Sequence, residues 1–522
     1  MTTHRMIARL SILTLAAAGM CAVALAQASH AGHAAVPHTA PTLRSALPSV
    51  QDAKALLQHT DMCRDWVAVP VGKDIVLAFV VYPMRADKAP VVLVTAPHEG
   101  TNAWVRAVGD QLAAEGFIAI APDLLTNMGP NRGDSESFAS PDAIADALRR
   151  MGPKEIARRM NAVRRYAKEL PAANGTIATM ELDRGELDSR PSSMKLSAGE
   201  QSMVMPLAPE HWPHAVDYLN RGTGNSFVAD SSMSMSDHAA HMGMHSGMLM
   251  AVQSGAKSGS GSTGPAISYA EKQPNLPAAY YTALSTLNKS KLRKEWVEIP
   301  YGDIKLHTWV EYPAGEGKAG VVIVMQFGTG MDEWIRAVAD QLAQEGFIAV
   351  AADMWSGTAP NGGGRDSFEF VDDAMKAGAK IREDETQRRY KAARDWALKL
   401  PRANGKTGSI GFCAGGGNSF RFAGEVPELN AAVVYYGTPP TPEVMAKIKA
   451  PVLGFYGEND ARVTSTVAPT IEAMEKLGKV YEPHVYPKTT HSFLYFQDMA
   501  GNPAATNDAW PRTVAFFKKY LN

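Results

Sequence analysis

The feature that most constrains the fold of this chain is a long internal repeat. Residues 104–123 read WVRAVGDQLAAEGFIAIAPD, and residues 334–353 read WIRAVADQLAQEGFIAVAAD. Trp104 therefore corresponds to Trp334, at an offset of 230 residues, the difference between the two numbers. The same offset holds from about residue 66 to about residue 175 of the first copy. Similarity at one constant offset over such a length indicates a duplicated domain rather than a short repeating unit.

Each copy alternates apolar runs, typical of strands, with helical stretches. In the second copy we expect two helices, at residues 332–345 and 384–400, and a further helix at the C-terminus. The strands are expected at residues 308–313, 319–327, 347–353, 408–412, 431–437 and 451–457. Continuous runs rich in Val and Ile, separated by helices, are typical of a mostly parallel sheet covered on both faces. The sequence therefore predicts an α/β fold.

The two copies diverge after residue 175. The second copy continues GKTGSIGFCAGGGNSF, whereas the first reads GTIATMELDRGELDSR; a second possible match lies further on, at GTGNSF of residues 222–227. Depending on the match, Met180 or Asn220 stands for Cys413, and neither alternative supplies a Ser or Cys nucleophile. We therefore expect an incomplete, silent copy at residues 60–228 and a catalytic domain at residues 289–522.

The N-terminal segment has the pattern of a secretory signal peptide. Arg5 and Arg9 precede the apolar run LSILTLAAAGMCAVALA, which ends in Ala-x-Ala at residues 24–26 or 26–28. A charged start, a short apolar run and small residues at the cleavage position are typical of export. We expect residues 1–28 to be removed and the mature protein to be periplasmic or secreted, with no membrane anchor.

The charge of the chain is balanced, with 52 Lys and Arg against 53 Asp and Glu and a net charge of −1. No overall field attracts it to nucleic acid, so a small-molecule partner is the expectation. The oligomeric state is not predictable from the sequence.

Two cysteines remain after removal of the signal peptide, Cys63 and Cys413. In an exported protein such a pair permits a disulfide. Cys63 precedes the first strand of the first copy, however, whereas Cys413 lies deep within the second. The surroundings of Cys413 suit a nucleophile, so we expect it to be a free thiol.

A biased segment, expected as a linker at residues 229–288, separates the copies. It ends in SGAKSGSGSTGP, which is typical of a flexible linker. Thioethers and imidazoles before that stretch are ligands suited to Cu(I). The candidate copper ligands are His238, His241, His245, Met242, Met244 and Met248. A disordered linker of biased composition and a copper site, as in a periplasmic copper-handling protein on a retained hydrolase scaffold, both stay open.

The chemistry of the second copy is predicted by three residues in chain order. Cys413 follows a strand and precedes glycines that open a helix, which is the local order of a nucleophile elbow. Asp460 follows the strand PVLGFYG, and His491 follows the next apolar segment. The order nucleophile, acid, histidine is that of an α/β-hydrolase triad, with His491 as base and Asp460 as its orienting partner.

These motifs resemble those of the dienelactone hydrolase family, a cysteine branch of the α/β hydrolases. The matching pieces are GFCAGG around Cys413, GENDARV with Asp460, and HSF with His491, and the resemblance covers the second copy. It implies hydrolysis of an enol lactone or a similar small ester through a thioester acyl-enzyme, with no cofactor. It also implies an oxyanion hole formed by the backbone N–H groups of Ala414 and Phe327.

Two departures from the family pattern concern the substrate pocket. Gln326 stands where the family has a Glu that accepts the proton of the cysteine in the resting enzyme. An amide cannot accept a proton, so a standing ion pair between Cys413 and His491 is an alternative way to keep Cys413 ionised. Tyr495 stands near the place of a family Arg that binds the substrate carboxylate, which argues against a charged dienelactone as substrate. Trp355 is a further candidate for the pocket wall.

Overall fold

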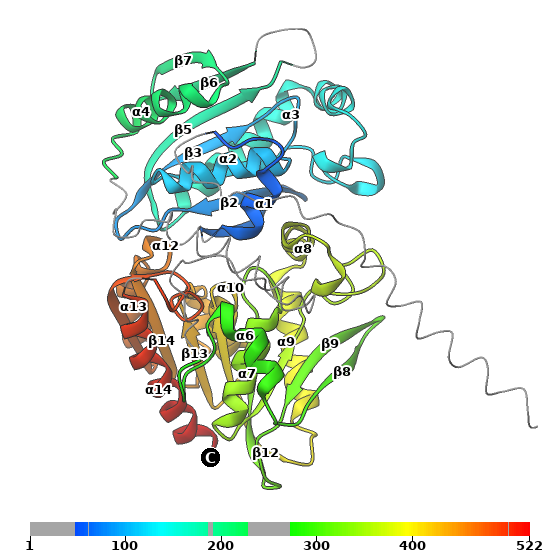
Figure 1. Ribbon diagram of the computed structural model, residues 1–522, viewed down its shortest axis with the longest axis vertical. Coiled ribbons are helices and arrows are strands. Elements are labelled where there is room, and N and C mark those ends of the chain that lie inside the picture. Colours follow the sequence, from blue (N-terminus) through cyan, green and yellow to red (C-terminus); the bar gives the residue numbers. More distant parts are fainter. Residues whose placement is uncertain (1–46, 61, 186–191, 228–271, 500) are drawn as a thin grey trace, which may run out of the picture. The chain divides into compact units, whose positions relative to one another are not determined.

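The computed structural model describes residues 47–60, 62–185, 192–227, 272–499 and 501–522. Each copy of the repeat has its own sheet (Figure 1). The predicted signal peptide and the Met- and His-rich segment lie outside the described residues. No helix in the described ranges is long and apolar enough to cross a membrane.

The sheet of the first copy has seven strands in the order β1-β2-β4-β3-β5-β6-β7. Strands β4, β3 and β5 are parallel, and the strands on both sides of them are antiparallel. The strands are β1 Cys63–Val71, β2 Asp74–Tyr82, β3 Ala89–Thr95, β4 Ile118–Asp123, β5 Ala173–Asp183, β6 Ser193–Ala198 and β7 Gln201–Pro206. The helices are α1 Ala53–His59, α2 Ala103–Ala114, α3 Pro141–Glu169 and α4 Trp212–Thr223.

The sheet of the second copy has eight strands in the order β15-β14-β13-β12-β10-β11-β9-β8. The six strands from β15 to β11 are parallel, and at one edge β9 pairs antiparallel with both β11 and β8. The strands are β8 Lys294–Tyr301, β9 Ile304–Glu311, β10 Ala319–Met325, β11 Ile348–Ala352, β12 Ala403–Phe412, β13 Ala431–Tyr435, β14 Val452–Asn459 and β15 Tyr481–Thr490. This arrangement confirms the predicted α/β-hydrolase fold.

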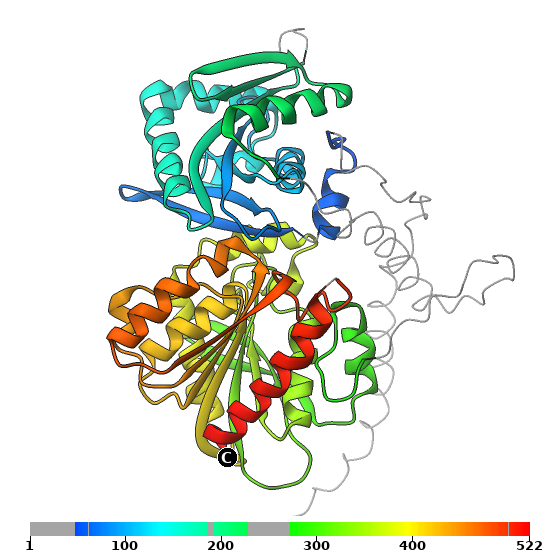
Figure 2. The same cartoon turned by 90° about the vertical axis from the view of Figure 1, so that its left-hand side faces the viewer.

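Helices cover both faces of this second sheet (Figure 2). One apolar core contains side chains of α6, α7 and α14, and another contains side chains of α9, α10 and α13. Strands β10 and β11 are buried along their whole length, because they are covered on both sides. The helices are α6 Ala283–Lys289, α7 Glu333–Gln344, α8 Val371–Gly378, α9 Glu383–Ala397, α10 Ala414–Glu425, α11 Pro442–Met445, α12 Ala461–Thr464, α13 Val467–Lys476 and α14 Asn502–Leu521.

The repeat extends further towards the N-terminus than sequence similarity indicates. The indole N–H of Trp104 donates to the carbonyl of Pro48 at 2.9 Å, and that of Trp334 donates to the carbonyl of Ala278 at 2.8 Å. The two bonds are related by the same offset of 230. Leu276, Ala278, Ala283 and Leu287 are buried in the core of the second copy. The second domain therefore begins before residue 289, within the segment expected to be linker.

The loop after the fourth strand of each copy is held by the same arginine contact. Arg159 Nη1 donates to the carbonyls of Leu124 and Thr126 in the first copy. Arg389 Nη1 makes the equivalent bonds, 230 residues later, at 2.7 and 2.9 Å. A buried guanidinium that satisfies two carbonyls of one turn fixes the conformation of that turn. The first copy has thus kept the backbone geometry of the second up to this point.

The structures of the two copies diverge at the strand that precedes Cys413 in the second copy. Met180 pairs with Val94 as Ile410 pairs with Val324, so Met180 corresponds to Ile410 and the predicted equivalence of Met180 with Cys413 is wrong. By this register the residue at the place of Cys413 is Asp183. There β5 continues into the antiparallel hairpin β6–β7, which is an addition that the sequence reasoning did not predict. The alternative residue, Asn220, lies in α4.

Candidate active site

Cys413 lies at the turn between β12 and α10. Its backbone angles are φ 55° and ψ −117°, an unfavourable region for a residue with a Cβ. Gly415 allows this turn, because a Cβ there would lie 2.3 Å from the carbonyl oxygen of Met325 and 2.4 Å from that of Gln326. The turn holds the thiol at the N-terminus of α10, where the helix dipole favours a thiolate.

His491 and Asp460 come together beside this turn. Asp460 follows β14 and His491 follows β15, and the Nδ1 atom of His491 lies 2.5 Å from Oδ2 of Asp460. A ring nitrogen of His491 and the sulfur of Cys413 lie within 4.8 Å of each other. The other ring nitrogen, Nε2, is buried without a hydrogen-bond partner among the described residues. The predicted catalytic residues are therefore brought together, with one imidazole nitrogen on the carboxylate and the other available to the thiol.

The charges in this site favour a thiolate beside an imidazolium. A hydrogen bond from the Cys63 thiol lowers the pKa of Cys413 well below its ordinary value, although burial opposes the shift, and His491 and Arg462 lower it further. Burial alone would lower the pKa of His491, but the Asp460 carboxylate and the Cys413 thiolate raise it to about 10. This pair matches the standing ion pair expected from the presence of Gln326 in place of a Glu.

The two expected oxyanion donors lie on adjoining segments. Ala414 is the first residue of α10, where backbone N–H groups have no partner within the helix. Phe327 comes just after β10, in the segment whose carbonyl groups closely approach Gly415. The contact at Gly415 therefore places the start of α10 directly against the end of β10.

The three expected pocket residues have different surroundings. The side-chain carbonyl of Gln326 accepts the backbone N–H of Met354 at 3.0 Å, so it supports the loop after β11. Trp355 is buried against Gly330 and Gly378, at both of which a Cβ would clash with its ring. Tyr495 is half-buried in an aromatic group, stacked on Tyr280 at 5.0 Å and in contact with the rings of Phe327 and Trp334. The ring of Tyr495 contacts Phe327, a residue that is expected to bind the substrate carbonyl.

Sequence reasoning missed three residues at this site, two of which belong to the first copy. The guanidinium of Arg462 contacts Asp65 at 3.1 Å, the sulfur of Cys63 at 2.6 Å and the sulfur of Cys413 at 3.9 Å. The backbone N–H of Ala461 also donates to the carbonyl of Arg85 at 2.9 Å. The beginning of β1 in the first copy therefore lies beside the nucleophile of the second. Cys63 and Cys413 are both free thiols, and their separation in the sequence did not reveal their proximity in space.

Tyr436 is a further neighbour that was not predicted. It follows β13 with φ 40°, and its ring lies 4.9 Å from that of His491. The residue is fully buried, and its hydroxyl has no hydrogen-bond partner within the described part of the chain. Its strained backbone and its position at a strand end beside Cys413 are typical of a functional region.

A buried ion cluster lies at the end of β4 in the first sheet. Lys376 of α8 lies 2.9 Å from Asp134, 2.8 Å from Glu136 and 4.0 Å from Asp123. Burial raises the pKa of Asp123 to about 6, although Lys376 opposes the shift. A lysine from the second copy thus neutralises the carboxylates that follow β4 of the first.

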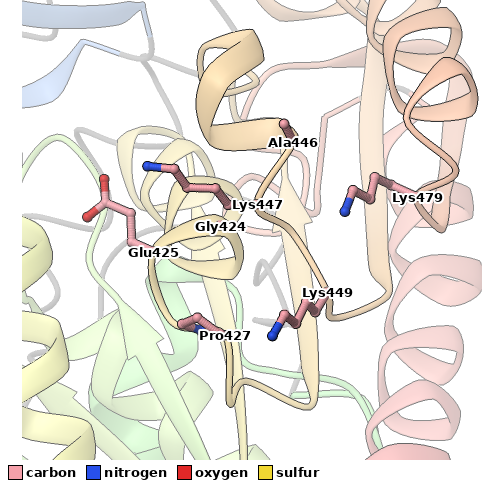
Figure 3. Close-up of a pocket in the computed structure, with 7 residues that line it drawn as sticks. All are labelled: Gly424, Glu425, Pro427, Ala446, Lys447, Lys449 and Lys479. Atoms are coloured by element: carbon pink, nitrogen blue, oxygen red, sulfur yellow. The ribbon is translucent and has the colours of Figure 1, made fainter.

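One surface pocket of the second copy lies away from Cys413 (Figure 3). It is lined by Gly424, Glu425, Pro427, Ala446, Lys447, Lys449 and Lys479. Gly424 and Glu425 end α10, whereas Cys413 precedes its first residue, so the helix separates the two places by roughly 15 Å at about 1.5 Å per residue. The candidate copper ligands at residues 238–248 lie outside the described residues.

Comparisons with known proteins identify the family of this chain. The model of the dienelactone hydrolase family matches residues 76–180 and 306–521. "Protein usf" of Aquifex pyrophilus is 32% identical over 240 residues, which cover 44% of this chain and 99% of that protein. A protein of Saccharolobus solfataricus named "Putative carboxymethylenebutenolidase" is 28% identical over 228 residues, covering 38% of this chain and 88% of its own length.

A crystal structure of a dienelactone hydrolase from Anabaena variabilis covers 45% of this chain and all of its own, with 23% identity and a TM-score of 0.36. The matched family segments include residues 173–180 of β5 in the first copy and all of β12 to β15 in the second. The chain belongs to the dienelactone hydrolase family and is an ester or lactone hydrolase of that family.

Proposed function

We propose that this chain is an exported hydrolase of small esters or lactones that acts through Cys413, His491 and Asp460. The observation that carries the proposal is the geometry at the end of β12. A strained turn holds Cys413 within 4.8 Å of a nitrogen of His491, whose Nδ1 atom is 2.5 Å from Asp460. Export rests on the signal-peptide pattern at residues 1–28.

In the proposed reaction the Cys413 thiolate attacks the ester carbonyl. The negative charge that develops on the carbonyl oxygen is stabilised by the N–H groups of Ala414 and Phe327. The His491 imidazolium then protonates the leaving alkoxide, which leaves a thioester on Cys413. In the second half of the reaction His491 takes a proton from water, and the resulting hydroxide attacks the carbonyl carbon of the thioester. The C–S bond breaks, which releases the acid and regenerates the Cys413 thiolate.

The chemistry requires no cofactor, since nucleophile, base and oxyanion donors all come from the chain. Asp460 orients His491 and stabilises its charged form. The rings that contact Tyr495 are uncharged, and Arg462, which lies 3.9 Å from the Cys413 sulfur, is already paired with Asp65. We therefore propose neutral acyl groups rather than a dienelactone carboxylate.

The test is a panel of small aryl esters and lactones with the mature protein and its Cys413→Ala variant. We expect turnover of neutral esters by the parent and its loss in the variant. Lys449→Met is the control, because this residue lines the surface pocket away from Cys413. A Cys413→Ala variant as active as the parent would contradict the mechanism. Mass measurement of the protein recovered from the medium or periplasm tests export and signal removal.

A further inference from the structure

Cys63 is placed at the active site although it belongs to the copy without a nucleophile. Its sulfur, the sulfur of Cys413 and a nitrogen of His491 all lie within 4.8 Å of one another. Cys63 is the first residue of β1, where the pairing of that strand with β2 ends at Tyr82. A disulfide requires a sulfur–sulfur distance of about 2.05 Å, so the two atoms have less than about 3 Å to close. Rotation of the two side chains covers movements of this size.

The charges around the two sulfurs favour oxidation of Cys413 first. Arg462 contacts both sulfurs, and the thiol of Cys63 donates to the sulfur of Cys413. The hydrogen bond with Cys413 raises the pKa of Cys63 well above its ordinary value. Cys413 is therefore the thiolate of the two cysteines, and Cys63 is the thiol. A low-pKa cysteine beside a second, resolving cysteine is the usual arrangement of a redox-sensitive site.

Metal binding is a weaker use of the same three side chains. The guanidinium of Arg462 contacts both sulfurs and is paired with Asp65, so a positive charge already lies beside the group. A second cation there would meet direct repulsion at short range. The arrangement suits two sulfurs that exchange protons and electrons better than two sulfurs that bind an ion.

We propose that Cys63 and Cys413 form a reversible disulfide on exposure to a peroxide, which switches the nucleophile off and protects it. The effect on activity rests on the proposed function of Cys413, whereas formation of the bond does not. The silent copy would thereby supply the resolving cysteine of the catalytic one.

The first step is attack of the Cys413 thiolate on one oxygen of hydrogen peroxide. The O–O bond breaks, a sulfenic acid forms on Cys413, and the released hydroxide takes the proton of His491 to become water. In the second step the sulfur of Cys63 attacks the sulfur of Cys413. The S–O bond breaks and hydroxide leaves with the proton of Cys63 as a second water. Two thiols are thus oxidised by two electrons, and a small dithiol reverses the process by exchange.

The bond would also limit damage to the nucleophile. A sulfenic acid without a partner thiol proceeds to the sulfinic acid, which simple thiols do not reduce. A resolving cysteine within 4.8 Å competes with that second oxidation, because its reaction is intramolecular. The oxidised enzyme is therefore expected to recover when a dithiol is added.

The test uses the full mature chain treated with hydrogen peroxide, blocked with an alkylating reagent and digested with trypsin without reduction. Cleavage after Lys54, Arg64, Lys406 and Arg421 separates Cys63 and Cys413 onto residues 55–64 and 407–421. We expect a linked pair of these peptides, lighter by two hydrogen atoms than their sum. Dithiothreitol should remove it and restore most of the esterase activity. The fraction of its initial esterase activity that Cys63→Ser regains with dithiothreitol should be roughly fivefold smaller than the fraction that the parent regains.

Met62→Leu is the matched control for oxidation of the neighbouring methionine, and it should recover as the parent does. An active enzyme that shows no linked peptide after inactivation overturns the proposal, as does equal recovery of the parent and Cys63→Ser. A linked peptide in a protein without esterase activity supports the disulfide and counts against the proposed function alone. The peptide measurement on the parent decides the matter even when Cys63→Ser does not fold.

Discussion

The Nδ1 atom of His491 lies 2.5 Å from the Oδ2 atom of Asp460, and both side chains are almost completely buried. In this position Asp460 holds one tautomer of the imidazole and favours its charged form. Its effect on His491 is therefore both geometric and electrostatic, and each part can be tested.

Asp460→Asn is expected to lower kcat for small esters by about a hundredfold or more, the usual range for loss of an effective general base. The amide still occupies the space but no longer stabilises imidazolium. KM should change much less. Steady-state kinetics measures both values, and Asp508→Asn, on α14, is the control. An Asp460→Asn variant with unchanged kcat would show that His491 acts without this partner.

The pH profile of kcat/KM is expected to have a broad plateau. Because the pKa of Cys413 is lowered, the thiolate persists as the pH falls, and activity declines only well below the ordinary thiol range. At the alkaline end activity should fall near pH 10, where His491 loses the proton that the leaving group needs. Ultraviolet absorbance of the thiolate gives an independent reading, and a rise in activity at about pH 8.5, as for an ordinary cysteine, would contradict the ion pair.

Arg462→Met is expected to destabilise the protein by about 3 kcal/mol, because it leaves the Asp65 carboxylate buried without its partner. It should also raise the pKa of Cys413 and move the acid limb of the pH profile upward. The double variant Asp65→Asn, Arg462→Met should recover part of the lost stability. Thermal unfolding of the four proteins in the cycle measures the coupling, and strictly additive effects would show that the pair is unimportant.

Lys376→Met is expected to lower the midpoint of thermal unfolding at pH 7, because Asp123, Asp134 and Glu136 lose their shared cation. The loss should become smaller below about pH 5, since a carboxyl such as Asp123, whose pKa is about 6, is then neutral without a partner. Lys380→Met, an exposed residue nearby, is the control. A loss that grows towards low pH would contradict this explanation.

The sequence was sufficient for the fold of the second copy and for the choice of three residues that the structure brings together, whose catalytic role stays a prediction. The strand predicted at residues 408–412 is the buried end of β12, and the helix predicted at residues 332–345 is α7 with Asp332 as its N-cap. Both predictions depend on the pattern of apolar residues within a short segment, and a single sequence contains that pattern. Cys413, Asp460 and His491 were found because their order and the strands between them are also local information.

Residues brought in by the other copy were not predictable in the same way. Cys63 and Arg462 are separated by 399 positions, and no periodicity connects them. The hairpin β6–β7 did leave a signal, because Met194, Leu196 and Ala198 alternate with exposed or half-buried residues before a turn at Gly199. That alternation was overlooked because the comparison with the second copy ends where the two copies diverge, after residue 175.

The position of Cys63 and Asp65 changes how sequence variation in the first copy should be interpreted. In a saturation mutagenesis screen scored by esterase activity, substitutions at these two positions should stand out within a domain that has no nucleophile of its own. Most other surface positions of that domain should tolerate replacement. A domain without a predicted nucleophile would thus contain two positions that affect esterase activity, both within the first three residues of β1.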